Sequence, residues 1–313
     1  MRLRARPMTP RRADWTLLLA TAIWGVTFPV VKRGLAEATP LAFLALRFGI
    51  ASALLLPTLR RGMRPGPKEL AGGALLGGLV AVGFMTQHTG LVYTTPSRSA
   101  FIVAVSSILA PVIAFALLGE RPRWPVVAAL ALAALGVYLL TAPDAAGLNR
   151  GDLWTLACAV CFGGQIVAVT ELVRRYDLRR LVWVQLAATA LLAALGLLFL
   201  ERPAVHWSWT FVAILAYVAL FPSALAFVLQ MRAQRHMSSA RAALIFCIEP
   251  VFAAGTSWLV LGERLASTQW LGGGLILLGM VLADAPRSDV RHQTSEPGPV
   301  EVQSPNPDIS PDS

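Results

Sequence analysis

Long apolar stretches recur along the whole chain and are separated by short polar joints. A helix needs about 20 apolar residues to cross roughly 30 Å of hydrocarbon, and ten stretches approach that length. They cover about 15–31, 41–59, 70–93, 99–119, 125–142, 153–170, 181–200, 208–230, 241–261 and 266–283. The sequence lacks the alternating segments of about ten residues that mark a membrane barrel, so helices must satisfy the backbone. The pattern predicts an all-α polytopic membrane protein with ten transmembrane helices.

Composition and charge support this class and add an orientation. Of the 313 residues, 56% are hydrophobic and 14% are charged, whereas soluble proteins carry about 25% charged residues. The net charge of +10 could indicate a nucleic-acid partner. With the N-terminus in the cytoplasm, however, twenty of the 27 Lys and Arg residues fall on the cytoplasmic side and six on the other. We therefore expect an inner-membrane protein with both termini in the cytoplasm and no nucleic-acid partner.

An internal repeat divides the chain into two units. The letters LGER close an apolar run at residues 118–121 and again at 261–264, an offset of 143 residues at which Arg98 also aligns with Arg241. Because five helices per unit is an odd number, the second unit enters the membrane from the opposite side, as in many alternating-access transporters. We expect a basic cytoplasmic N-terminus at 1–14, five-helix repeats at 15–142 and 151–283, and a disordered cytoplasmic tail at 285–313.

Several short motifs follow one another in a fixed order. The first helix contains WG-x-x-F with Trp24 and Phe28, the fourth begins with YTTPSRSA, and the ninth contains Glu249 and Pro250. Together with the duplication, these motifs resemble the drug/metabolite transporter superfamily, EamA type, over about residues 15–283. The resemblance implies ten helices and transport of small metabolites, often export of amino acids. The resemblance does not identify the substrate of this chain, because the first unit has two serines where the second has Glu249 and Pro250.

Polar residues near the middle of the expected helices are candidates for a substrate cavity. Gln165 lies about 18 Å into the sixth helix and Glu249 about 16 Å into the ninth, where polar groups are costly and usually face a cavity. Trp24 and Thr27 lie at similar depth, and aromatic rings could wall such a space. The candidate cavity residues are Trp24, Thr27, Phe28, His88, Ser106, Gln165, Tyr217, Glu249 and Pro250.

Glu249 is a lone carboxyl group deep in the apolar run IFCIEPVFAA. A charged carboxylate is expensive at that depth, so the group could exchange a proton unless a cation compensates it. Pro250 has no backbone N–H, and we expect the helix to kink there. Two functional roles stay open, proton coupling and binding of a substrate amino group. The structural alternative is a neutral acid that is hydrogen-bonded to a neighbouring helix.

Three arginines stand close to or inside the apolar segments. Arg47 lies about 9 Å inside the second helix, and Arg98 and Arg241 begin the fourth and ninth helices. Long basic side chains near helix ends usually extend to the water interface, so we expect all three to snorkel. The alternatives are anion binding for Arg47 and a carboxylate partner for each of the other two.

The remaining motifs have structural interpretations. Gly119 and Gly262 in the two LGER segments are expected to end helices, which makes LGER a repeated helix stop. Cys158, Cys161 and Cys247 lie in apolar helices without a second CxxC or a nearby His, so we interpret them as packing residues. We expect neither a metal site nor a cofactor.

The sequence as a whole favours a secondary transporter of small metabolites that exports amino acids or related compounds by alternating access around a midplane cavity. Uptake of a small polar metabolite is the main alternative. A membrane enzyme is disfavoured because no paired acids or metal-ligand spacings cluster near an interface, and a scaffold would not need polar residues at mid-depth in both halves. The expected partners are a small-molecule substrate, the lipid bilayer and, if Glu249 titrates, protons.

Overall fold

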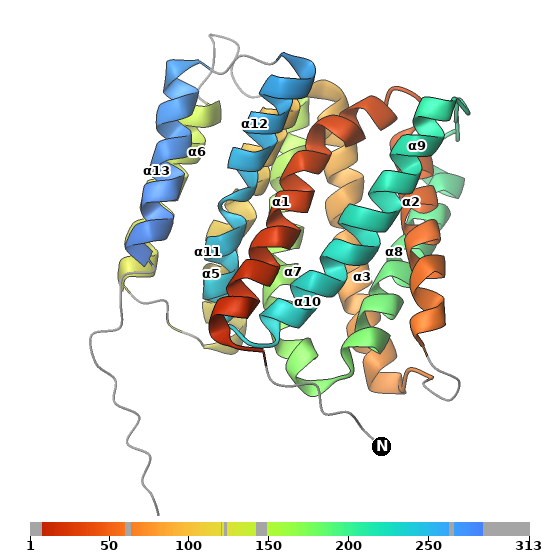
Figure 1. The fold of residues 1–313 in the computed structure, drawn as a ribbon, viewed down its shortest axis with the longest axis horizontal. Helices are drawn as coiled ribbons and strands as arrows, with labels where there is room; N and C mark the ends of the chain where they lie inside the picture. Colours follow the sequence, from red (N-terminus) through yellow and green to blue (C-terminus); the bar gives the residue numbers. More distant parts are fainter. Residues whose placement is uncertain are drawn as a thin grey trace, which may run out of the picture.

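The computed structural model describes residues 8–59, 64–119, 121, 124–141, 149–262 and 266–283. The tail expected at 285–313 lies outside these ranges. The described residues form a helical bundle (Figure 1). Its helices are α1 (Pro10–Gly34), α2 (Pro40–Leu55), α3 (Pro67–Tyr93), α4 (Pro96–Val103), α5 (Val105–Leu118), α6 (Trp124–Thr141), α7 (Arg150–Arg175), α8 (Leu178–Leu200), α9 (Trp209–Val218), α10 (Ala226–Gln234), α11 (Ser239–Phe246), α12 (Glu249–Leu261) and α13 (Ser267–Ala283), with a short 3₁₀ turn η1 (Leu56–Thr58) and a π-helical segment η2 (Ala219–Leu225).

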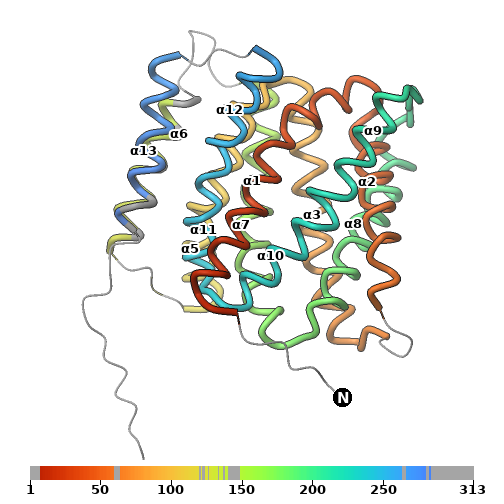
Figure 2. The backbone as a smooth tube through the Cα atoms, in the orientation of Figure 1, coloured from red at the N-terminus to blue at the C-terminus, as the bar shows by residue number. Residues whose placement is uncertain are grey.

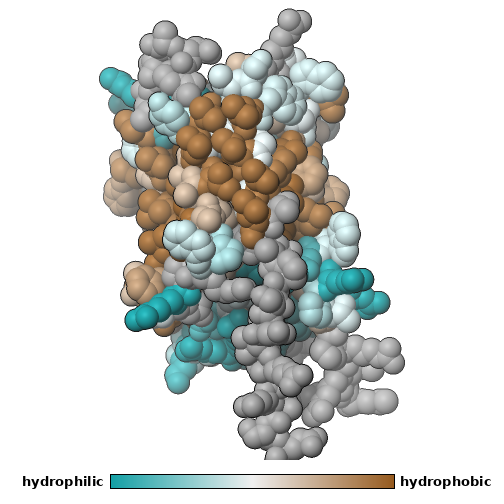
Figure 3. All heavy atoms as spheres, turned by 90° about the vertical axis from the view of Figure 1, so that its left-hand side faces the viewer, coloured by the Kyte–Doolittle hydropathy of each residue, from teal (hydrophilic) through white to brown (hydrophobic). Residues whose placement is uncertain are grey.

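Three pairs of these helices form continuous rods. α4 continues as α5, α9 runs through η2 into α10, and α11 continues as α12. With each composite counted once, the described ranges contain ten rods, so the expected ten helices and the all-α class are confirmed. Eight rods are long and apolar enough to cross a membrane, and the other two, α6 and α13, have 18 and 17 residues. Figure 3 shows an apolar band on one face of the bundle with hydrophilic residues at its lower end, as expected for a surface that lipid covers.

Both repeats interrupt the same helix at the same place. The break between α4 and α5 lies at Ala104, and the break between α11 and α12 lies 143 residues later at Cys247. The interruption expected beside Pro250 is therefore confirmed. The first repeat has Ser107 at the aligned position, so a proline is not required, and the break is a property of the repeat itself.

The two repeats interleave rather than standing side by side. α1 of the first repeat packs on α10 and α12 of the second, and α7 of the second packs on α3 and α5 of the first. Glycine permits two of these crossings: a Cβ on Gly25 would lie 2.6 Å from the backbone oxygen of Glu249, and a Cβ on Gly163 would lie 3.0 Å from that of Ser106. α6 and α13 pair with each other at one edge (Figure 2).

The LGER segments end helices as expected. Gly119 follows α5 and Gly262 follows α12, with φ angles of 71° and 64°. This left-handed conformation favours glycine because other residues have a Cβ that clashes there. The interpretation of LGER as a repeated helix stop is confirmed for the two glycines, whereas Glu120, Glu263 and Arg264 lie outside the described residues.

Two names for the ends of the bundle are used below. The proximal end is the one at which α1 begins, at the bottom of Figure 1, and the distal end is the opposite one. Because the rods alternate in direction, α4 and α7 begin at the distal end, whereas α1 and α11 begin at the proximal end.

Candidate functional site

A cavity lies where the two repeats interleave, with an empty volume of about 680 Å³ when its mouth is included. Both repeats contribute walls, and the lining contains polar and aromatic side chains. The polar lining residues are Thr27, Arg47, Gln87, Ser106, Gln165, Gln230 and Glu249. The aromatic lining residues are Trp24, Phe28, Phe84, Phe162, Phe227 and Phe246. This mixture suits a small ligand with a polar head and an apolar body.

Six of the nine residues that the sequence suggested meet at this cavity, namely Trp24, Thr27, Phe28, Ser106, Gln165 and Glu249. The other three are not among its lining residues. His88 is fully buried with its ring 5.6 Å from the rings of both Phe43 and Phe84. Tyr217 packs against Phe221, with 5.4 Å between ring centroids, and Pro250 is buried directly after Glu249.

Trp24 is fixed in the aromatic wall by one hydrogen bond. Its indole Nε1 donates to the backbone oxygen of Pro222 over 2.7 Å, and its ring meets Phe227 edge-on at 5.3 Å. Pro222 lies in the π-helical segment η2, where the backbone departs from regular α-helical bonding. The irregular backbone of one repeat thus orients the tryptophan of the other.

Arg47 lies in the cavity wall, and the expectation that it snorkels to the surface is wrong. Its side chain is 1% exposed. Nε donates to Ser223 Oγ over 2.6 Å, and the guanidinium carbon lies 4.7 Å from the ring centroid of Phe84. Among the described residues no carboxylate forms an ion pair with it. A lone cation in an apolar helix was visible in the sequence, but the pattern gave its depth and not the direction in which it points.

Glu249 begins α12 directly after the break in its rod and lines the same cavity. No described side chain or backbone group forms a hydrogen bond or an ion pair with its carboxyl group. The cavity therefore holds one basic and one acidic group that are not paired with each other within 4 Å. A polar ligand could satisfy both groups at once.

A pair of glutamines forms another part of the wall. Gln165 of α7 and Gln230 of α10 exchange two amide hydrogen bonds of 3.3 and 3.0 Å. Gln230 was missed because the expected eighth helix ended at that residue, whereas the helix runs on to Gln234. Each amide could turn toward a ligand only by giving up its partner.

The remaining polar and sulfur groups do not form a metal site within the described ranges. No group of three His, Cys, Asp or Glu side chains there could hold a metal ion. Cys158, Cys161 and Cys247 are free thiols, and two of them are buried.

The expected snorkelling of Arg98 and Arg241 is also wrong, because they pair with Asp152 and Asp14, respectively.

Comparisons with known proteins agree with this architecture. The model of the EamA-like transporter family matches residues 11–142 and again 149–283. An uncharacterized transporter of Archaeoglobus fulgidus is 33% identical over 86% of this chain and 85% of its own length. A probable terminal-alkyne amino-acid exporter of Streptantibioticus cattleyicolor is 27% identical over 92% of this chain and 98% of its own. A crystal structure with 21% identity covers 87% of this chain and 96% of its own with a TM-score of 0.69, which supports the fold.

Proposed function

The chain belongs to the EamA-like transporter family, and from that premise we propose that it exports amino acids or related zwitterions by alternating access around the cavity. It is a multi-pass membrane protein of a transporter family, which implies a small-molecule substrate. The finer proposal concerns the substrate class, the direction of transport and the residues that bind. It includes no catalytic turnover, so substrate should leave the cavity chemically unchanged.

The observation that carries the proposal is the pair of unpaired opposite charges in one cavity. Arg47 and Glu249 both line it, and no described group of opposite charge forms an ion pair with either. An uncompensated charge in a low-dielectric site is costly. A zwitterion would offset both costs. Its carboxylate would pair with the guanidinium of Arg47, and its ammonium group would pair with the carboxylate of Glu249. The aromatic wall around Trp24 and Phe84 suits an apolar substituent.

Glu249 has two roles compatible with this arrangement. In the first it accepts hydrogen bonds from the substrate ammonium group. In the second it takes up a proton when the substrate leaves and so couples export to a proton gradient. Both roles need a carboxyl group, the first for its negative charge and the second for its ability to bind a proton. Glu249→Gln removes the carboxyl group while keeping the shape of the side chain.

Orientation and direction are also part of the proposal. The excess of Lys and Arg at the proximal end supports a cytoplasmic proximal end. The exporter of Streptantibioticus cattleyicolor, similar over nearly its whole length, supports outward transport. Membrane-impermeant thiol reagents should reach His236→Cys only from the cytoplasm and Ala204→Cys only from outside, and the reverse pattern would refute this orientation.

The experiment that tests the binding proposal measures efflux of labelled amino acids from vesicles containing purified protein. Arg47→Gln and Glu249→Gln should each lower the flux at least about tenfold, since one lost charge-assisted contact costs more than 1.4 kcal/mol. Arg175→Gln changes an exposed charge and Glu37→Gln a partly buried one, both outside the cavity, and the two serve as controls. Wild-type flux in both cavity variants would refute the proposal, and chemically altered product would indicate an enzyme.

A further inference from the structure

Charged side chains from α1 and α7 hold the first residues of α4 at the distal end and those of α11 at the proximal end. The distal clamp consists of Lys32, Thr94, Arg98 and Asp152. The proximal clamp consists of Asp14, Arg174, Met237 and Arg241. Neither set lines the cavity, so substrate binding does not account for them.

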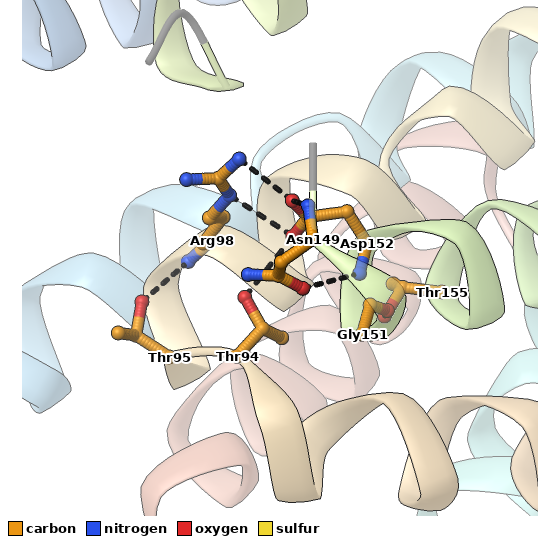
Figure 4. Close-up of polar contacts among 7 residues, drawn as sticks. All are labelled: Thr94, Thr95, Arg98, Asn149, Gly151, Asp152 and Thr155. Carbon is orange, nitrogen blue, oxygen red and sulfur yellow. Dashed lines mark hydrogen bonds and ion pairs between the residues drawn. The ribbon is translucent and has the colours of Figure 1, made fainter. Parts of the chain in front are cut away.

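The distal clamp is a network centred on Asp152 (Figure 4). Arg98 binds its carboxylate with two nitrogens, Nη2 at 2.6 Å from Oδ2 and Nε at 2.9 Å from Oδ1. Thr94 Oγ1 donates to the same Oδ1 over 3.1 Å. From α1, Lys32 Nζ donates to the backbone oxygen of Thr94 over 3.1 Å and also to that of Leu91. The start of α4 is therefore tied to α7 through Asp152 and to α1 through Lys32.

The proximal clamp repeats this design with the two long helices exchanged. Arg241 binds Asp14 of α1 with two nitrogens, Nη2 at 2.7 Å from Oδ2 and Nε at 2.8 Å from Oδ1. Arg174 of α7 donates from Nη2 to the backbone oxygen of Met237 over 2.9 Å. The start of α11 is therefore tied to α1 through the carboxylate and to α7 through the cation.

The correspondence between the clamps follows from the repeat. Thr94, Thr95 and Arg98 align at an offset of 143 with Met237, Ser238 and Arg241. Thr95 and Ser238 each cap their short helix by accepting a hydrogen bond from the backbone N–H of the aligned arginine. Two ends that share an arginine, a helix cap, an ion pair and a carbonyl contact are unlike chance surface pairs, which contribute little on their own.

The clamped helices also contribute to the cavity wall. α4 and α11 have eight residues each and end at the repeated break, so a movement of either helix would hinge at that break and leave α5 or α12 straight. Val103 at the end of α4 and Phe246 at the end of α11 line the cavity. Movement of either short helix would open the cavity toward its own end of the bundle.

We propose that the distal and proximal clamps are the two gates of the carrier and that they open in turn. In this structure both clamps are formed and hold α4 and α11 in place. Release of the Asp152 clamp opens the distal side, and release of the Asp14 clamp opens the proximal side. This inference rests on the proposed carrier function, because only alternating access requires two gates that exclude each other.

The test measures access to the cavity from each side and needs no substrate. Ser106→Cys, placed in a background without the three native cysteines, is labelled in vesicles by an impermeant thiol reagent added on one side or the other. Asp152→Asn should raise the labelling rate from the distal side about tenfold or more, and Asp14→Asn should raise it from the proximal side by less than about tenfold. Glu69→Gln is the matched control, since it breaks the 2.8 Å ion pair with Arg180 without touching α4 or α11.

Two further variants keep the result decisive. Arg98→Lys retains the charge but loses the two-nitrogen contact, and it should show the same distal effect if Asp152→Asn does not fold. The double variant of Arg98→Gln with Asp152→Asn should be no more accessible than either single variant, because the clamp acts as one unit.

The outcomes separate the two proposals. One-sided increases support the gates whether or not amino acids are carried. Equal increases in labelling rate from both sides, or no increase in the folded variants, would refute the gate proposal. The transport proposal would still be tested separately by the flux assay.

Discussion

The two ends of the bundle carry the same clamp pattern but seal the cavity differently. At the distal end the cavity reaches Val31, only about 4.5 Å along α1 from its last residue, whereas Trp24 lies about 21 Å from the first residue. The proximal stretch is filled by an apolar plug that includes Ala13, Leu17, Ala110, Ala114, Ala233, Met237, Ala242 and Ala243. The distal clamp has the more buried carboxylate, with Asp152 1% exposed and Asp14 28% exposed.

The two gates therefore differ in the interactions that keep them closed. The distal gate combines a desolvated ion network around Asp152 with an apolar cluster that includes Val31, Phe43, Leu91 and Phe211. The proximal gate depends mainly on apolar packing, and its ion pair lies near solvent, where such pairs are weak. Loss of an ion pair should therefore have a larger effect at the distal end than at the proximal end.

The largest expected effect is on the distal ion pair. Asp152→Asn removes the carboxylate that Arg98 binds with two nitrogens in a partly buried site, and it should lower the free energy of unfolding by about 3 kcal/mol. Asp14→Asn should lower it by no more than about 1 kcal/mol. Thermal unfolding of the purified variants measures both, and equal losses would remove the distinction between the two ends.

The apolar plug should give the next largest effect. Leu17 is fully buried in it, and Leu17→Ala should cost about 2–3 kcal/mol of packing. Labelling of Ser106→Cys should then rise from the proximal side alone. The matched control Leu91→Ala truncates a buried leucine next to the distal clamp and should act on the distal side. Proximal labelling that stays unchanged in folded Leu17→Ala would show that the plug does not seal this end.

A smaller effect is expected where the glycines permit the long helices to cross. A Cβ on Gly25 meets the backbone oxygen of Glu249 at 2.6 Å, and one on Gly163 meets that of Ser106 at 3.0 Å. Gly25→Ala should cost about 1–3 kcal/mol by overpacking and also reduce flux, since it displaces Glu249. Gly163→Ala should be milder in both measurements, and a reversed order would contradict the crossing geometry.

The smallest effects should come from the caps of the short helices. Thr95→Ala and Ser238→Ala each remove one capping oxygen, worth about 1 kcal/mol. The first should speed labelling of the cavity from the distal side and the second from the proximal side, each by less than about tenfold. Identical profiles for the two variants would argue that α4 and α11 do not move separately.

The sequence predicted the elements that depend on local pattern. Apolar runs predicted the ten helices, Gly119 and Gly262 predicted two helix ends, and Pro250 predicted the break in the ninth helix. The matching break at Ala104 has no proline, and only its place in the repeat could have indicated it. Local pattern therefore defines where helices start and end but not every interruption.

The site was predicted less completely because depth does not define direction. Hydropathy placed Arg47 inside a helix but could not show that it faces Phe84 and Ser223 rather than the interface. The carboxylate partners of Arg98 and Arg241 come from the other repeat and depend on tertiary packing. His88 was expected to line or gate the cavity near the outer end of the third helix, yet it packs between Phe43 and Phe84.

The central claim is that a zwitterion is carried between Arg47 and Glu249, and counterflow in vesicles tests it most directly. Vesicles preloaded with an unlabelled amino acid should accumulate the labelled form transiently through wild-type protein. The methyl ester, which lacks the carboxylate, and the des-amino acid, which lacks the ammonium, should neither drive nor undergo exchange. Equal exchange of all three compounds, or none with any amino acid through correctly inserted protein, would contradict the account.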